Sequence, residues 1–146
     1  MRVFAALAVL TMMSCASTKV QKVPTPPPAA KQSDLAGAPF TLSAITVNGK
    51  EIPLPATRRP TMQFTETDRV SGMAGINRYS GGVSLSGTEG LTFGPMITTK
   101  MAGPSDAMAL EAGFLDAIST VTRMEYQAGK LKLATADGAT RLEFIR

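Results

Sequence analysis

Short stretches of alternating apolar and polar residues, separated by turn dipeptides, constrain the fold of this chain more than any other feature. The alternation is clear at Met62 and Phe64, and again at Leu131 and Leu133. Dipeptides that favour tight antiparallel turns stand between such stretches at Asn48-Gly49, Ala128-Gly129 and Asp137-Gly138. Because a period of two places one set of side chains on one face, each stretch predicts a half-buried strand. We expect seven to eight short antiparallel strands.

One segment, residues 105–121, departs from this rhythm. Its apolar residues recur at helical spacing, at Leu110, Phe114, Ile118 and Val121. Ser105 is a favourable N-cap, and Asp106 suits the positive end of a helix dipole. The prediction is therefore an α+β fold: a curved antiparallel sheet, shaped as a partial barrel, with one packed α-helix whose apolar stripe lies on the sheet.

The first 15 residues have the layout of an export signal. Arg2 supplies positive charge, and the apolar run at residues 3–13 is too short for a membrane span, which needs about 20 residues. The run ends at Met12-Met13-Ser14-Cys15, which resembles the bacterial lipobox. We expect a signal peptide over residues 1–14 and lipid attachment at Cys15, with an ordinary secretory cleavage after Ala16 as the alternative.

Residues 15–34 read as the lipidated cysteine followed by a proline-rich tether, and residues 35–146 as one domain. Pro24 and residues 26–28 bias the tether to polyproline II, which at about 3.1 Å per residue reaches roughly 50 Å from the anchor. Pro24 and Pro27 also have the spacing of a proline-directed recognition motif. Bacterial lipoproteins with Asp after the lipidated cysteine tend to stay in the inner membrane. Ala16 here implies a lipid anchor in the outer membrane, facing the periplasm.

The net charge of +4 is concentrated outside the domain. Leader and tether hold four basic residues against Asp34, whereas the chain from Leu35 onward has 11 basic and 10 acidic residues. A nucleic-acid-binding domain needs its positive charge on the folded surface. We therefore expect no nucleic-acid partner, and tether lysines that favour anionic lipid headgroups.

Composition also restricts the chemistry available to the chain. There is no His, and Cys15 is the only Cys, which excludes Ser-His and Cys-His catalysis and His-ligated metals. Glu66 and Asp68 are close in sequence on a predicted turn, whereas acid–base catalysis needs opposed carboxylates in a cleft. We expect no enzymatic activity, no metal site and no cofactor.

The most distinctive stretch, residues 70–81, reads Val-Ser-Gly-Met-Ala-Gly-Ile-Asn-Arg-Tyr-Ser-Gly. Residues 91–95 (Leu-Thr-Phe-Gly-Pro), residues 98–102 (Thr-Thr-Lys-Met-Ala) and the predicted helix follow in order. This arrangement resembles the META domain of the HslJ-like, heat-shock-named family, over roughly residues 35–146. The resemblance implies an envelope protein linked to stress tolerance. It does not imply a reaction.

The chain departs from the family pattern at two positions. Many relatives have Cys where Ile76 stands and a second Cys where Gly103 stands. Neither cysteine is present here, so a redox or disulfide role of that pair does not apply to this chain. Phe40 stands where relatives often begin the domain with Trp.

The candidate interaction patch is Asn77, Arg78, Tyr79 and Lys100. Glycines around Asn77 allow close approach, which suits a polar recognition surface. The alternative is structural, with Asn77 bonding backbone in a turn, Arg78 paired to a carboxylate and Tyr79 half-buried. Thr98, Thr99 and Lys100 also lie near the predicted helix N-terminus, where anions bind. Arg58 and Arg59 read as an exposed basic pair.

Three functional hypotheses remain open. The first is a non-catalytic envelope lipoprotein whose domain contacts an envelope protein partner or serves stress tolerance. The second is a carrier that encloses a small apolar ligand or lipid between sheet and helix. A third, weaker one is an enzyme using Asp or Glu. The first requires an exposed patch, the second an apolar cavity, and the third a carboxylate in a cleft.

Overall fold

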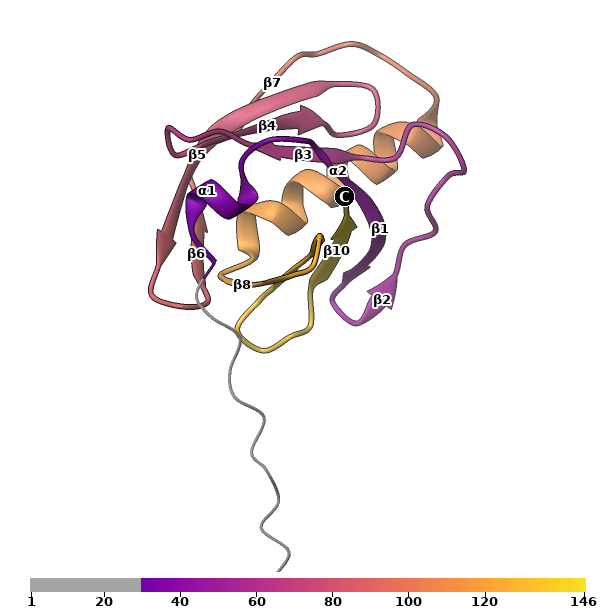
Figure 1. Cartoon of the computed structure of the whole chain (residues 1–146). Coiled ribbons are helices and arrows are strands. Elements are labelled where there is room, and N and C mark those ends of the chain that lie inside the picture. The colour runs from indigo at the N-terminus through magenta and orange to yellow at the C-terminus, as the bar shows by residue number, and fades with distance from the viewer. Residues whose placement is uncertain (1–29) are drawn as a thin grey trace, which may run out of the picture.

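The computed structural model describes residues 30–146, so the predicted signal peptide, Cys15 and most of the predicted tether lie outside the described residues. Two helices and ten strands make up the described chain (Figure 1). In chain order they are α1 (Gln32–Leu35), β1 (Phe40–Val47), β2 (Lys50–Glu51), β3 (Thr61–Phe64), β4 (Arg69–Met73), β5 (Arg78–Ser86), β6 (Gly90–Phe93), β7 (Ile97–Thr98), α2 (Ser105–Thr120), β8 (Arg123–Gln127), β9 (Lys130–Ala134) and β10 (Arg141–Ile145). No helix among the described residues is both long and apolar enough to cross a membrane.

Two of the three predicted turn dipeptides form two-residue turns, whereas Asp137-Gly138 lies within a longer loop, residues 135–140, between β9 and β10. Asn48 and Gly49 both have positive φ, 51° and 76°, and join β1 to β2. Ala128 and Gly129, with φ of 48° and 79°, join β8 to β9. Two successive positive φ values match the right-handed twist of the flanking strands, which is why such dipeptides mark hairpins.

The sheet closes on itself, so the predicted partial barrel is more closed than expected. Eight strands follow one another in the order β10-β9-β8-β6-β5-β4-β3-β1, and β10 pairs with β1 to complete the ring. The closing pair runs from Thr41 opposite Ile145 to Thr46 opposite Arg141. The two-residue strands β2 and β7 add to β1 and β5 outside the ring. Because β1 and β10 pair with each other, neither the first nor the last ring strand is left as an exposed sheet edge.

Helix α2 packs across the interior of the ring. All four residues of the predicted stripe are buried, and the ring of Phe114 makes edge contacts with Tyr79 on β5 and Phe144 on β10. β5 and β10 are four strands apart in either direction around the ring, so Phe114 touches opposite walls. In Figure 1 the helix lies in the middle of the view, with β1 and β10 on one side and β5 and β6 on the other.

The start of α2 corrects one prediction. Ser105 is the first helical residue, and the N-cap is Pro104, which provides no side-chain cap. The carbonyl of Pro104 accepts the first helical bond from the backbone N–H of Met108. Proline fixes φ near the value that this position needs, so it ends the preceding loop in place of a capping side chain.

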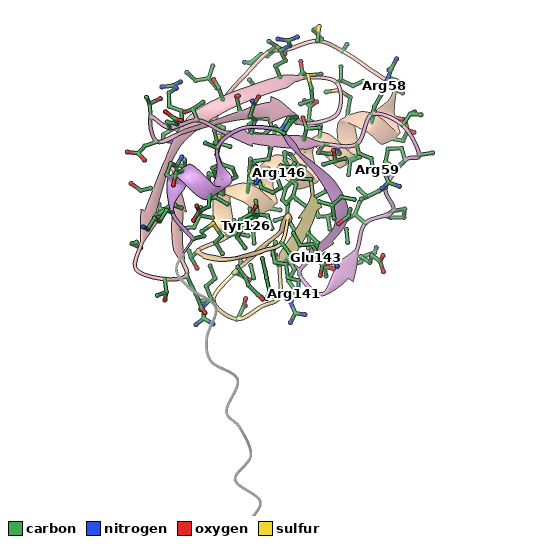
Figure 2. The ribbon with its side chains drawn as sticks, viewed as in Figure 1. Arg58, Arg59, Tyr126, Arg141, Glu143 and Arg146 are labelled. Carbon is green, nitrogen blue, oxygen red and sulfur yellow. The ribbon has the colours of Figure 1, made fainter. Side chains whose placement is uncertain are left out.

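Helix α1, Arg146 and the adjoining β1–β10 pair form a region here called the seam. The guanidinium of Arg146 donates to the carbonyl oxygens of Asp34, Leu35 and Ala36, and to the hydroxyl of Tyr126 at 2.7 Å. It also lies 4.5 Å from the ring centroid of Phe40. The predicted boundary between tether and domain, at residues 34 and 35, falls inside this helix. Figure 2 labels Arg146 and Tyr126.

Candidate functional site

The distinctive motif forms one end of the molecule, here called the motif end. It comprises the β4–β5 loop, the segment from β7 to the start of α2, and the β2–β3 loop that carries Arg58 and Arg59. Three adjoining grooves line it, and each shares residues with the next. The motif end therefore joins segments that are far apart in the sequence.

Asn77 lies at the centre of the motif end with 1% of its surface exposed. Its side-chain oxygen accepts from the backbone N–H of Met101 at 2.7 Å and from the hydroxyl of Thr99 at 2.8 Å. Its side-chain nitrogen donates to the carbonyl of Met101 at 3.1 Å and to Glu111 Oε1 at 2.7 Å. The Asn77 amide therefore connects the β4–β5 loop to the segment between β7 and α2, and to α2 itself.

Glu111 completes this network from the first half of α2, where it is 6% exposed. Its Oε2 accepts from the backbone N–H groups of Asn77 at 2.8 Å and Ile76 at 3.1 Å. A buried carboxylate that accepts several N–H groups is stabilised by charge-assisted hydrogen bonds. Glu111 was not singled out in the sequence. The signal that would have found it is a charged residue next to Leu110 on the face of a helix that must be buried.

The four residues of the predicted patch divide between the interior and the surface. Asn77 and Tyr79 are buried, whereas Arg78 and Lys100 are exposed. Tyr79 donates from its hydroxyl to the carbonyl of Thr61 at 2.8 Å, and burial raises the pKa of its phenol well above the ordinary 10.0. A surface formed by these four residues therefore presents only Arg78 and Lys100.

Exposed apolar side chains accompany these cations. Ile97 on β7 is 73% exposed and Met101, in the segment before α2, is 53% exposed. Ile97 borders a groove of about 430 Å³ that Arg78 and Met73 also line. The predicted anion-binding residues Thr98 and Thr99 stand here as well, where the Thr99 hydroxyl accepts from the backbone N–H of Arg78 and donates to Asn77.

The basic pair of the β2–β3 loop borders the same end. Arg58, exposed and with a positive φ of 58°, lines a groove of about 570 Å³ together with the start of α2. Arg59 lies in the smaller groove between that one and the strands, and donates to the carbonyl of Pro55 at 3.1 Å. Figure 2 shows both arginines at one side of the molecule, far from the place where the described chain begins.

The remaining candidate carboxylates lie elsewhere. Glu66 and Asp68 are exposed on the turn between β3 and β4. Within residues 30–146, no three acidic side chains gather closely enough to hold a metal ion. Neither carboxylate lines any of the three grooves of the motif end.

Ile76 and Gly103, the two positions at which the family resemblance implied cysteines in many relatives, are in contact. A Cβ atom built on Gly103 would lie 2.7 Å from Cγ1 of Ile76 and 3.1 Å from its Cδ1. The isoleucine side chain therefore fills the space above the glycine. This contact joins the β4–β5 loop to the segment before α2, as the Asn77 network does.

Comparison with known proteins identifies the family. The model of the META domain matches residues 33–146. The chain belongs to the META domain family. The match begins inside α1 and ends at Arg146, so this META domain includes the seam as well as the motif end. A search of the curated proteins found no match.

Solved structures share the fold of this META domain. An NMR structure of a protein from Burkholderia xenovorans aligns with a TM-score of 0.65 at 22% identity, covering 90% of this chain and 97% of that one. A second NMR structure aligns with a TM-score of 0.58 at 26% identity, covering 80% and 94%. The crystal structure of a DUF4847 family protein from Bacteroides vulgatus aligns with a TM-score of 0.57 at 12% identity, covering 78% and 95%.

Proposed function

We propose that this META domain is the non-catalytic contact module of a lipid-anchored envelope protein, and that it acts through the surface of its motif end. One observation carries the proposal. The polar side chains of Asn77 and Glu111 are bonded inside the protein. Outside, Ile97, Lys100 and Met101 follow one another along one exposed segment, and Arg78 lies on β5, which pairs with that segment at β7. Such a surface is suited to binding and holds no free acid–base pair.

The anchor rests on the sequence of the leader. Cys15 follows a signal-like apolar run and is the only cysteine of the chain. Several acyl chains on one residue give stable attachment, since each buried CH₂ contributes about 0.8 kcal/mol. A role in stress tolerance rests on the family resemblance alone.

The carrier hypothesis has less support than surface contact. A carrier needs a continuous apolar cavity, and side chains of α2 lie between opposite walls of the ring. Phe114, Ala117 and Ile118 are each 0% exposed. The interior of the ring is thus packed with the protein's own side chains.

Lipidation is tested in cells of the native host fed a fatty acid that carries an alkyne. The wild-type chain is expected to take up the label and to fractionate with the envelope. The Cys15→Ala variant is expected to lose both properties. Labelling that survives Cys15→Ala, or a wild-type mature mass that corresponds to cleavage after Ala16 without lipid, would overturn the anchor.

Surface contact is tested by placing a photo-crosslinking amino acid at position 97 in the same cells. Adducts to any envelope component are expected from position 97 and not from position 145. Ile145 is the matched control, because it is an exposed large apolar side chain of the described residues that lies on β10 and lines none of the three grooves of the motif end. Equal adducts from both positions, or none from position 97, would contradict contact through the motif end.

A further inference from the structure

We propose that the motif end docks on an anionic lipid bilayer, so that the domain lies against the membrane that carries its anchor. This inference deepens the proposed function by naming the envelope component that the motif end contacts. It rests on the arrangement of cations and apolar side chains at that end.

Cations predominate at the motif end. Arg58, Arg59 and Arg78 line its three grooves, and Lys100 follows Thr99 on the exposed segment. Asp106 is the one acidic residue among the groove-lining side chains. The domain as a whole is nearly neutral, with 11 basic and 10 acidic residues from Leu35 onward. The positive charge is therefore local, and it complements anionic headgroups.

The apolar side chains next to these cations project outward. Ile97 and Met101 are the two most exposed large apolar residues of the described chain, at 73% and 53%. Both lie within three residues of Lys100, Ile97 on β7 and Met101 on the segment between β7 and α2. Protruding apolar side chains flanked by Lys and Arg are suited to the boundary between headgroups and acyl chains.

A bilayer fits this surface better than an acidic protein does. A stable protein interface usually buries about 800 Å² on each partner and centres on aromatic or Arg side chains that fill pockets. At the motif end the aromatic side chain, Tyr79, is buried and faces α2. The exposed groups are instead long side chains at the start of β5, on β7 and on the two neighbouring loops, which need only a fluid, charged plane opposite them.

The anchor makes even a weak contact effective. Attachment to the same membrane raises the effective concentration of the surface next to the bilayer, so modest affinity is enough for docking. The described chain begins on the side of the molecule opposite Arg58 and Arg59 in the view of Figure 2. The tether predicted from the sequence reaches roughly 50 Å, which allows the domain to turn and lie down.

The test uses the mature lipidated protein, purified from its host and reconstituted in vesicles. A fluorophore is attached to Ile97→Cys or, as control, to Ile145→Cys, since the lipidated Cys15 does not react. Vesicles contain a lipid-borne quencher and either phosphatidylglycerol with phosphatidylcholine or phosphatidylcholine alone. Position 145 is a stringent control, because it lies close to the predicted junction of tether and domain. The next residue, Arg146, donates to the carbonyl oxygen of Asp34 in α1.

The expected result is strong quenching at position 97 that requires phosphatidylglycerol, with weaker quenching at position 145. Each Lys or Arg near an anionic surface contributes roughly a fivefold gain in affinity. The double variant Arg78→Gln, Lys100→Gln should thus lower the ratio of docked to free domain about 25-fold. The matched control Lys130→Gln, Lys132→Gln removes the same charge from β9 and should leave quenching at position 97 unchanged.

Three outcomes would overturn the docking. They are equal quenching at the two positions, quenching that does not depend on phosphatidylglycerol, and quenching that the Arg78 and Lys100 substitutions leave unchanged. Photo-crosslinks from position 97 that reach only protein would overturn it too. A mass measurement on the same sample reports the lipid on Cys15, so failure of the anchor and failure of the docking are distinguished.

Discussion

The motif end and the seam at β1 and β10 hold distant parts of the chain together by different means. At the seam, two strands pair through their backbones over five residue pairs, and Arg146 donates to carbonyl oxygens of α1. At the motif end, loops are joined through the side chains of Asn77 and Glu111. Backbone pairing distributes stability over many bonds, whereas a buried side-chain network concentrates it in a few groups. Single substitutions should therefore cost far more at the motif end.

The largest effect is expected from Glu111→Ala. This substitution leaves the backbone N–H groups of Ile76 and Asn77 and one amide hydrogen of Asn77 without their carboxylate acceptor. Unsatisfied buried donors cost about 1–3 kcal/mol each, so the free energy of unfolding should fall by about 4 kcal/mol. Urea denaturation measures this, with exposed Asp116→Ala on the same helix as the control. A loss below about 1 kcal/mol would show that the network contributes little.

Next in size is the effect of Gly72→Ala on β4. A Cβ at this position would overlap the carbonyl oxygen of Thr61, which belongs to the neighbouring strand and cannot move away cheaply. We expect a loss of about 3 kcal/mol. Gly82→Ala is the matched control, because a Cβ there meets nothing within 4 Å. Similar denaturation midpoints for the two variants would refute close packing at the motif.

A stabilising change is expected from Ile76→Cys combined with Gly103→Cys in a Cys15→Ser background. The two positions are in contact, so the new cysteines should form a disulfide across the loops that Asn77 also joins. Closing a loop of this length contributes about 2–3 kcal/mol. The measurement is the shift of the denaturation midpoint on reduction. The single variants serve as controls, and free thiols in the oxidised double variant would contradict the geometry.

The smallest effect is expected at the seam, from Arg146→Ala. The variant loses the guanidinium bonds to α1 and the contact with Phe40, but the backbone pairing of β1 and β10 remains. The free energy of unfolding should fall by about 1–2 kcal/mol, with faster hydrogen exchange in α1. Arg141→Ala, whose side chain donates to the carbonyl of Gly138, is the control. A loss equal to that of Glu111→Ala would remove the contrast between the two regions.

Residues close together in sequence were enough to predict most of the elements. The alternation at Leu131 and Leu133, the turn at Ala128-Gly129 and the stripe on α2 all correspond to observed structure. These features depend on side-chain period and on turn conformation, which act over a few residues. The two-residue strands β2 and β7 are too short to show a period, and β7 exists only because β5 provides its partner.

Local patterns could not predict how distant residues meet. Asn77 and Glu111 are 34 residues apart, and Ser43 and its partner Glu143 across the seam are 100 apart. The motif was recognisable from its composition, but its alternation did not reveal that Asn77 would turn inward while Arg78 stayed outside. That division follows from the position of the carboxylate of Glu111 once α2 packs across the ring.

The strand pattern, the helix and the family could therefore be predicted from the sequence alone. They depend on the local spacing of apolar residues, on turn-forming dipeptides and on the order of motifs along the chain. The closure of the sheet, the contact between Ile76 and Gly103, and the separation of the motif into a buried network and an exposed basic surface were decided only by the fold. The physical reason is that burial and hydrogen-bond satisfaction depend on which segments are brought together, and those segments are far apart in the sequence.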